Sequence, residues 1–170
     1  MFDSQRLPYT PLIEAQGFYQ LGMIEDSQAS LDRVPEEDRQ SPEYRELQVL
    51  LLLWEGAWDE AIEASQGFVE AFPRLAFGYI HIAFAQHEQG KTEEALETLY
   101  TAPGFLRGEP VYHYNVACYH ASLNQISEAT EALSKSFRMD RRLKTWASND
   151  PDLSNLRYNS DLFSNDSLAS

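Results

Sequence analysis

Side chains able to bind a metal or act as nucleophiles gather between residues 113 and 120, where His113, Cys118 and His120 share one short stretch. If this stretch is helical, Cys118 and His120 point about 200° apart, and His113 lies about two turns from His120. Ligands in that arrangement do not converge on one ion. The chain has no Cys-x-x-Cys or His-Glu-x-x-His spacing, which are spacings that zinc sites use. We therefore expect no metal site.

Paired acidic residues, which could serve acid–base catalysis, occur at Asp59-Glu60 and Glu93-Glu94. Both pairs stand where helices are expected to begin, and negative side chains there stabilise the helix dipole. No Gly-x-Ser-x-Gly, phosphate-binding loop or Gly-x-Gly-x-x-Gly motif accompanies them. We expect a protein that is not an enzyme and that needs no cofactor.

The net charge of the 170-residue chain is −14 and is unevenly distributed. Residues 1–134 carry −15, whereas residues 135–157 carry +3. An acidic field repels nucleic-acid phosphates and anionic lipid head groups, so we expect neither nucleic acid nor membrane as a partner. The longest apolar run, Val49 to Trp54, has six residues, while a membrane-spanning helix needs about 20. The single cysteine and the absence of a signal-like start favour a cytoplasmic protein.

Turn-forming residues recur with a period of 34, at Gly22, Gly56, Gly90 and Asn124. Asparagine commonly replaces glycine in the left-handed conformation that ends a helix. Mostly small side chains hold fixed places around each turn. Seven residues before the turns stand Ala15, Val49, Ala83 and Ala117, and five residues after them stand Ser27, Ala61, Ala95 and Ala129. The pattern predicts four pairs of closely packed helices.

Local signals place the starts of several of these helices. Thr10 before Pro11 and Ser41 before Pro42 each offer a capping hydroxyl next to a proline at the first helical position. Thr92 is expected to cap the second helix of the third pair.

The 34-residue period with a helix, a glycine turn and a second helix resembles the tetratricopeptide-repeat family over about residues 9–141. Residues 112–157 also resemble the C-terminal end of some bacterial tetratricopeptide proteins whose function is not known. The resemblance implies an all-α, tetratricopeptide-like α-solenoid of about four helix–turn–helix repeats with a C-terminal capping helix, in which Trp146 packs on the last repeat. The expected single domain covers 9–157, with repeats at about 9–40, 41–73, 74–108 and 109–140, a cap at 141–157, and a polar tail at 158–170.

In this family the first helix of each repeat lines a concave groove, and the resemblance assigns twelve residues of this chain to a partner-binding groove. They are Leu12, Tyr19, Glu43, Glu46, Leu50, Leu53, Phe77, Ile80, Phe84, His87, Tyr114 and Cys118. This surface is apolar and aromatic, with two acids and no lysine or arginine. It therefore lacks the cations with which related domains clamp the acidic C-termini of heat-shock chaperones.

The resemblance implies a non-catalytic protein–protein interaction module or adaptor, whose partner is another protein or peptide. An apolar or amphipathic segment would fit the groove, and Glu43 and Glu46 would steer a basic flank of that segment. Two alternatives stay open. The protein could be a secretion-type tetratricopeptide chaperone for an exported subunit, or a structural subunit that self-assembles as a homo-oligomer. The chain could also cover the groove with its own residues.

Overall fold

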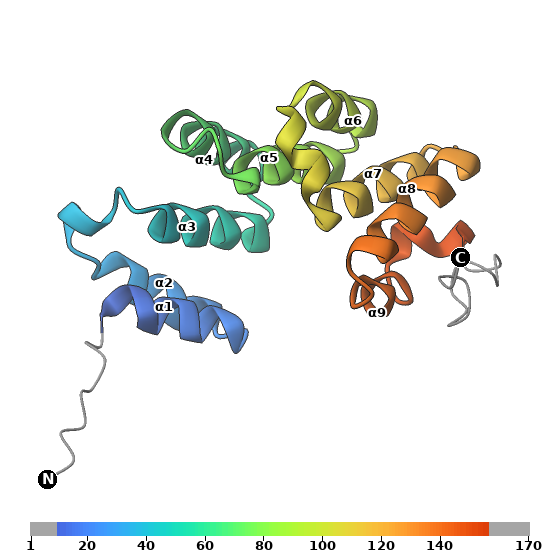
Figure 1. Ribbon diagram of the computed structural model, residues 1–170. Helices are drawn as coiled ribbons and strands as arrows, with labels where there is room; N and C mark the ends of the chain where they lie inside the picture. Colours follow the sequence, from blue (N-terminus) through green and yellow to red (C-terminus); the bar gives the residue numbers. More distant parts are fainter. Residues whose placement is uncertain (1–9, 157–170) are drawn as a thin grey trace, which may run out of the picture. The chain divides into compact units, whose positions relative to one another are not determined.

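The structure is a computed structural model that describes residues 10–156. Within these residues every regular element is helical, and antiparallel helical hairpins follow one another along the chain (Figure 1). The predicted all-α fold is confirmed. The chain divides between Pro73 and Arg74 into two compact units. The single domain predicted over 9–157 stays a prediction, and the tail predicted at 158–170 lies outside the described residues.

The first unit holds two hairpins joined by a short 3₁₀ turn. Its elements are α1 (Pro11–Gln20), α2 (Ile24–Asp32), η1 (Glu36–Asp38), α3 (Pro42–Glu55) and α4 (Trp58–Ala71). Its core is formed by α1, α2 and α3 around Ala15, Leu31 and Leu51. The Ser27 hydroxyl donates to the Ala15 carbonyl at 2.8 Å and so ties α2 to α1.

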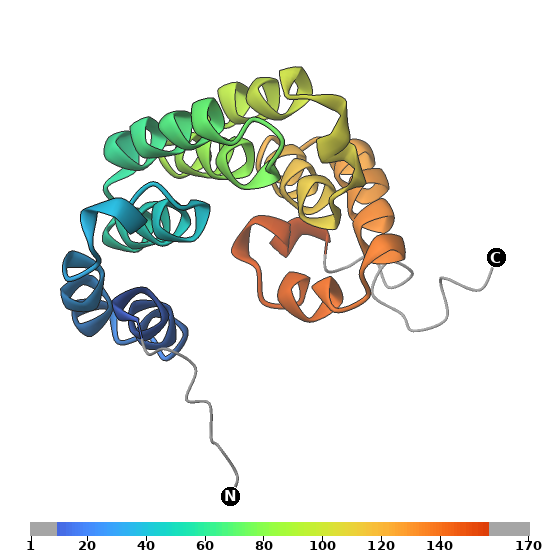
Figure 2. The same cartoon turned by 60° about the vertical axis from the view of Figure 1, so that its left-hand side comes forward.

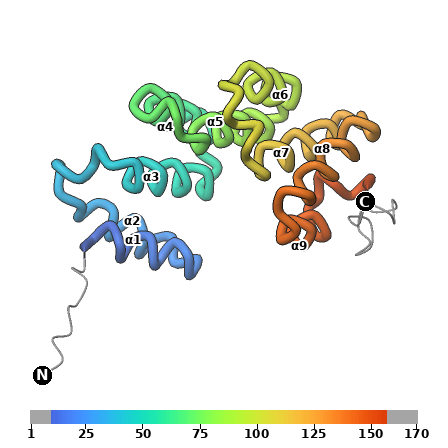
Figure 3. Tube along the Cα trace, viewed as in Figure 1, coloured from blue at the N-terminus to red at the C-terminus, as the bar shows by residue number. Residues whose placement is uncertain are grey.

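The second unit also holds two hairpins, followed by a segment that folds back. Its elements are α5 (Ala76–Glu88), α6 (Thr92–Thr101), η2 (Gly104–Gly108), α7 (Pro110–Ser122), α8 (Ile126–Met139), α9 (Leu143–Ala147) and η3 (Pro151–Leu156). Helix α7 is the centre of this unit, since almost all of its residues from Tyr112 to Ala121 are buried. Figures 2 and 3 show the chain leaving α8, turning through α9 and returning to α7 at η3.

The turns lie at the positions that the 34-residue period predicts. Gly22, Gly56, Gly90 and Asn124 all adopt positive φ, at 72°, 71°, 77° and 59°. Asn124 is the only non-glycine residue with positive φ among residues 10–156. The left-handed conformation reverses the chain after one helix and lets the next pack against it.

The predicted caps are right for the first helices and wrong for Thr92. The hydroxyls of Thr10 and Ser41 accept hydrogen bonds from the amides of Ile13 and Tyr44, at 3.3 and 3.4 Å. Thr92 instead lies inside α6, whose N-cap is Lys91. Its hydroxyl is bonded to His87 Nδ1 at 3.0 Å, so it supports a side chain of α5 rather than the end of α6.

The C-terminal segment is part of the core of the second unit. Leu153 is fully buried and Leu156 is 1% exposed, in the same cluster as Tyr114 and Cys118 of α7. The cap was expected to pack through Trp146, but that side chain is 60% exposed and touches Tyr114 only edge-on. Leu143 and Ala147, one turn apart on α9, form the buried face of the cap instead.

No helix among residues 10–156 has both the length and the apolar character needed to cross a membrane.

Candidate functional site

The twelve residues assigned to the groove lie on the first helices of the hairpins, six in each unit. Leu12, Tyr19, Glu43, Glu46, Leu50 and Leu53 belong to α1 and α3 of the first unit. Phe77, Ile80, Phe84, His87, Tyr114 and Cys118 belong to α5 and α7 of the second unit. A continuous groove over both units stays a prediction, and each unit presents its own surface.

Helices α1 and α3 of the first unit enclose an open pocket of about 340 Å³. Four of the predicted residues line it, together with three neighbours that the prediction left out. The lining is Gln16, Tyr19, Gln20, Glu43, Glu46, Leu47 and Leu50. Of the two remaining predicted residues of this unit, Leu12 packs against the core and Leu53 is 9% exposed.

This pocket, called the α1–α3 pocket below, is lined by two leucines and two glutamates among other residues. Burial raises the pKa of Glu46 above its ordinary value, and the neighbouring charge of Glu43 raises it further. Burial also raises the pKa of the Tyr19 hydroxyl. No lysine or arginine lines the pocket. A ligand that brings a cation would therefore relieve the repulsion between the two glutamates.

In the second unit, the equivalent face of α7 is covered by the chain's own C-terminal segment. The Tyr114 hydroxyl donates to Asp150 Oδ2 at 2.7 Å, and the Cys118 thiol donates to the same oxygen at 3.7 Å. Asn155 donates to the Ala121 carbonyl at 2.9 Å. Tyr114 and Cys118 are 6% and 4% exposed, so neither offers a free surface to a partner.

His87 of α5 fastens the same segment from a second side. Its Nε2 lies 3.1 Å from Asp152 Oδ2, and its ring stacks near Tyr119 with 4.7 Å between centroids. The hydrogen bond to Asp152 raises the pKa of His87 above its ordinary value, against the opposing effect of burial. The histidine is thereby favoured in its charged form, as a partner for a carboxylate.

The acidic pair Asp150 and Asp152 also meets Cys118, and the sulfur and the two carboxylates lie within 4.8 Å of one another. Burial raises the pKa of the Cys118 thiol, and the charges of Asp150 and Asp152 raise it further. The thiol therefore stays protonated and acts as a donor to Asp150. We interpret the cluster as hydrogen bonds that hold the C-terminal segment on α7. The absence of a metal site stays a prediction.

Sequence reasoning missed Asp150, Asp152 and Asn155. The signal for the two acids was the stretch Asn149 to Leu153, which places them and a proline directly after α9. It carries no repeat partner, so periodicity could not show where it folds.

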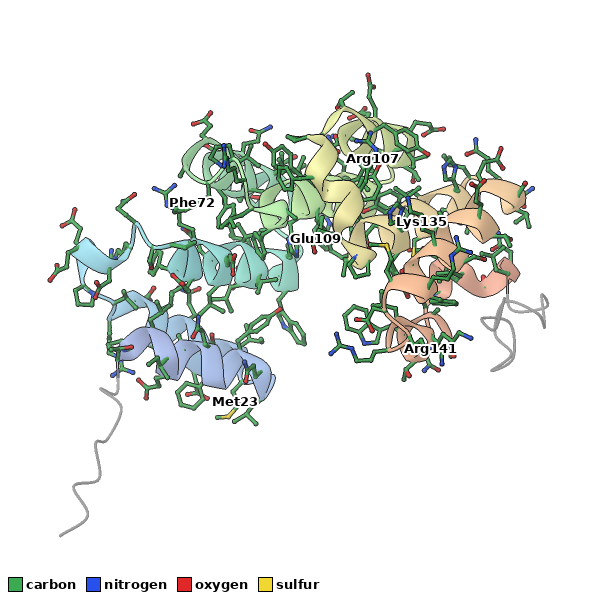
Figure 4. The ribbon with its side chains drawn as sticks, viewed as in Figure 1. Met23, Phe72, Arg107, Glu109, Lys135 and Arg141 are labelled. Carbon is green, nitrogen blue, oxygen red and sulfur yellow. The ribbon has the colours of Figure 1, made fainter. Side chains whose placement is uncertain are left out.

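The two histidines of α7 lie at a different surface from Cys118. His113 and His120 line an outer pocket of about 310 Å³ with Tyr100 of α6. Two cations also line it, Arg107 of η2 and Lys135 of α8, both labelled in Figure 4. His113 Nε2 is bonded to the Arg107 carbonyl at 3.0 Å, and His120 Nε2 to the Tyr100 hydroxyl at 2.5 Å. Both imidazole rings therefore form hydrogen bonds within the protein where α6, η2 and α7 meet.

Comparisons with known proteins identify the fold. No protein-family profile matches the sequence, and no curated protein matches it significantly. Among solved structures, the thermophilic tetratricopeptide-repeat protein TTC0263 of Thermus thermophilus is similar, with a TM-score of 0.73 and 21% identity over 88% of this chain and 80% of that one. PilF of Pseudomonas aeruginosa is similar with a TM-score of 0.70 and 20% identity, over 90% of this chain and 73% of that one. The chain has the tetratricopeptide-repeat fold.

Proposed function

We propose that the protein is a non-catalytic protein–protein interaction module whose α1–α3 pocket holds an apolar or amphipathic segment of another protein, with a basic residue beside it. Folds built from stacked helical hairpins generally present extended surfaces for binding other proteins. The observation that carries the proposal is the open pocket with Leu47 and Leu50 beside Glu43 and Glu46.

The contrast between the two units supports this location. In the second unit a short segment of the chain already lies on the equivalent helix, with Leu153 buried and polar side chains bonded around it. That segment shows which kind of peptide such a face can bind: one with two leucines flanked by polar groups. The first unit presents its face without such a segment among residues 10–73.

The pocket offers little for catalysis. Its titratable side chains are Tyr19, Glu43 and Glu46, and no histidine, cysteine, serine or lysine stands beside them in the lining. A nucleophile with an adjacent base is therefore missing there. The proposal includes a cytoplasmic location, which rests on the single cysteine of the chain.

Two other functions remain compatible with the fold: a chaperone for an exported subunit, and a self-assembling subunit. Both would use the same pocket, so they differ in the occupant rather than in the site. Phe77, Ile80 and Phe84 of α5 remain proposed binding residues of the second unit.

The test is affinity capture from native lysate with two double variants of equal charge change. One reverses the pocket acids, Glu43→Lys with Glu46→Lys. The control reverses two exposed acids of η1, Glu36→Lys with Glu37→Lys. We expect the wild type and the control to retain the same protein and the pocket variant to lose it, and a synthetic peptide from that protein to bind at least about tenfold more weakly to the pocket variant. Equal retention by all three folded proteins would place the binding site elsewhere.

A further inference from the structure

The α1–α3 pocket presents a charged and an apolar side chain one helical turn apart. Glu46 and Leu50 are at positions i and i+4 of α3, so they share one face. Glu43 lies one turn before Glu46 on the same side and is exposed. A ligand with a cation and an apolar group spaced by one turn of helix would match this face.

The C-terminal cap presents that complementary pair. Arg142 and Trp146 are also four residues apart, and Arg142 keeps helical backbone angles at the start of α9. The Arg142 side chain is 90% exposed and Trp146 is 60% exposed. Arg141, labelled in Figure 4 at the start of the cap, is exposed too. The neighbouring face of α9, about 100° around the helix, is buried through Leu143 and Ala147, so the cap is held in place while this pair stays accessible.

Arg142 can reach a second carboxylate without giving up the one it has. Its Nε and Nη2 donate to the Asp140 carboxylate at 3.0 and 2.7 Å. A guanidinium carries five N–H donors in a rigid fork, so one arginine can bridge two carboxylates.

The charge distribution of the chain favours the same pairing. Residues 135–157 carry +3, whereas residues 1–134 carry −15. Tryptophan and arginine are both among the residue types that are enriched at the energetic hot spots of protein interfaces.

We propose that the α1–α3 pocket of one copy receives the α9 cap of a second copy, with Arg142 against Glu46 and Trp146 on Leu50. This inference rests on the proposed function of the pocket as a binding site, and it takes the self-assembling alternative by naming a second copy of the chain as the occupant. Each copy then offers one pocket and one cap, so the contact is heterologous: the first unit of one copy meets the second unit of the next. The fraction of associated chains should therefore rise with protein concentration, and the affinity of the contact should fall as salt screens the ion pair.

The test is the mass of the full-length protein in solution, measured by sedimentation velocity across a wide range of concentrations. We compare wild type with E46R, R142E and W146A, and with E37R as the matched control on an exposed acid of η1. We expect the mass of wild type and E37R to rise with concentration. E46R, R142E and W146A should each need about tenfold more protein for the same mass.

Mixing the variants tests the pairing itself. The E46R chain keeps an intact cap and the R142E chain keeps an intact pocket, so an equimolar mixture should associate at concentrations where each variant alone is monomeric. A wild-type protein that is monomeric at every concentration would overturn the inference, and so would a mixture that does not associate. If wild type is monomeric while the lysate capture still depends on Glu43 and Glu46, the pocket binds a different protein, and only the second-copy inference fails.

Discussion

The hydroxyl of Tyr114 on α7 donates a hydrogen bond of 2.7 Å to Asp150, thirty-six residues further along the chain. This bond marks the place where the C-terminal segment returns to the helix that a partner was expected to contact. Burial and the bond to Asp150 both raise the pKa of the tyrosine. The hydroxyl therefore stays protonated and remains a donor to the C-terminal segment.

Removal of this donor should loosen the C-terminal segment. Tyr114→Phe deletes the hydroxyl and leaves Asp150 with one fewer partner, so we expect the free energy of unfolding to fall by about 1–3 kcal/mol. Urea unfolding followed by circular dichroism measures the change. Tyr112→Phe, on the same helix, is the control, because the structure records no hydrogen bond of that hydroxyl within residues 10–156. Equal losses for both variants would show that the bond to Asp150 contributes nothing.

The buried leucine of η3 should contribute more to stability than the hydrogen bond. Leu153 has no exposed surface, and truncation of a fully buried leucine to alanine usually costs about 2–5 kcal/mol. We expect Leu153→Ala to lower the free energy of unfolding by that amount. Leu75→Ala serves as the comparison, since Leu75 is 41% exposed. A small loss at Leu153, similar to that at Leu75, would mean that η3 does not pack on the second unit in solution.

The contact between His87 and Asp152 predicts a pH dependence. The pKa of His87 in the folded protein lies above its ordinary value of 6.5, so the stabilisation is complete below that pH and is lost as the pH rises through the folded-state pKa. Asp152→Asn should therefore destabilise the protein more at pH values below the ordinary pKa than at pH values well above the folded-state one. Burial lowers the pKa values of His81 and His113, so their contributions to the free energy of unfolding change with pH in the opposite direction. The quantity to measure is therefore the difference between wild type and variant in urea unfolding. A difference that is constant with pH would contradict the assignment.

Two glycines should respond to alanine in opposite directions. Gly90 has a φ of +77° and Gly67 lies inside α4, and an added Cβ would meet no atom within 4 Å at either position. Gly90→Ala is thus expected to lose about 1 kcal/mol of stability through backbone strain alone. Gly67→Ala should gain about 0.5–1 kcal/mol, because alanine favours a helix interior. Thermal unfolding of both variants checks the prediction, and a stabilising change at Gly90 would be incompatible with the left-handed turn.

The sequence was sufficient to predict the hairpins, because their determinants are local and repeated. The period of 34 located the turns through Gly22 to Asn124, and a hydroxyl before a proline located the starts of α1 and α3 at Thr10 and Ser41. Thr92 shows the limit of such signals: the same residue type can cap a helix or bond a side chain, and here His87 lies within reach of its hydroxyl.

The predicted groove residues line a pocket in the first unit, and their role in binding stays a prediction. Tyr19, Glu43, Glu46 and Leu50, which the resemblance to the family assigned to the groove, line a pocket. In the second unit the same resemblance selected Tyr114 and Cys118 correctly as residues on one face of α7. It could not show that Asp150 and Leu153 would cover them, because a contact across thirty-six residues leaves no periodic trace in the chain. Trp146 was expected to pack on the last repeat. It contacts Tyr114 of that repeat edge-on but is 60% exposed, whereas the smaller Leu143 and Ala147 form the buried face of α9.

The cover over the second unit can be measured most directly through Cys118, the single cysteine of the chain. We would follow the reaction of its thiol with a chromogenic disulfide reagent in the native protein, in Leu153→Ala and in urea. The thiol is 4% exposed and its pKa is raised, so we predict that the native protein reacts far more slowly than the unfolded chain and that Leu153→Ala reacts faster than wild type. Native protein that reacts as fast as unfolded protein would contradict the claim that the C-terminal segment closes this face of α7.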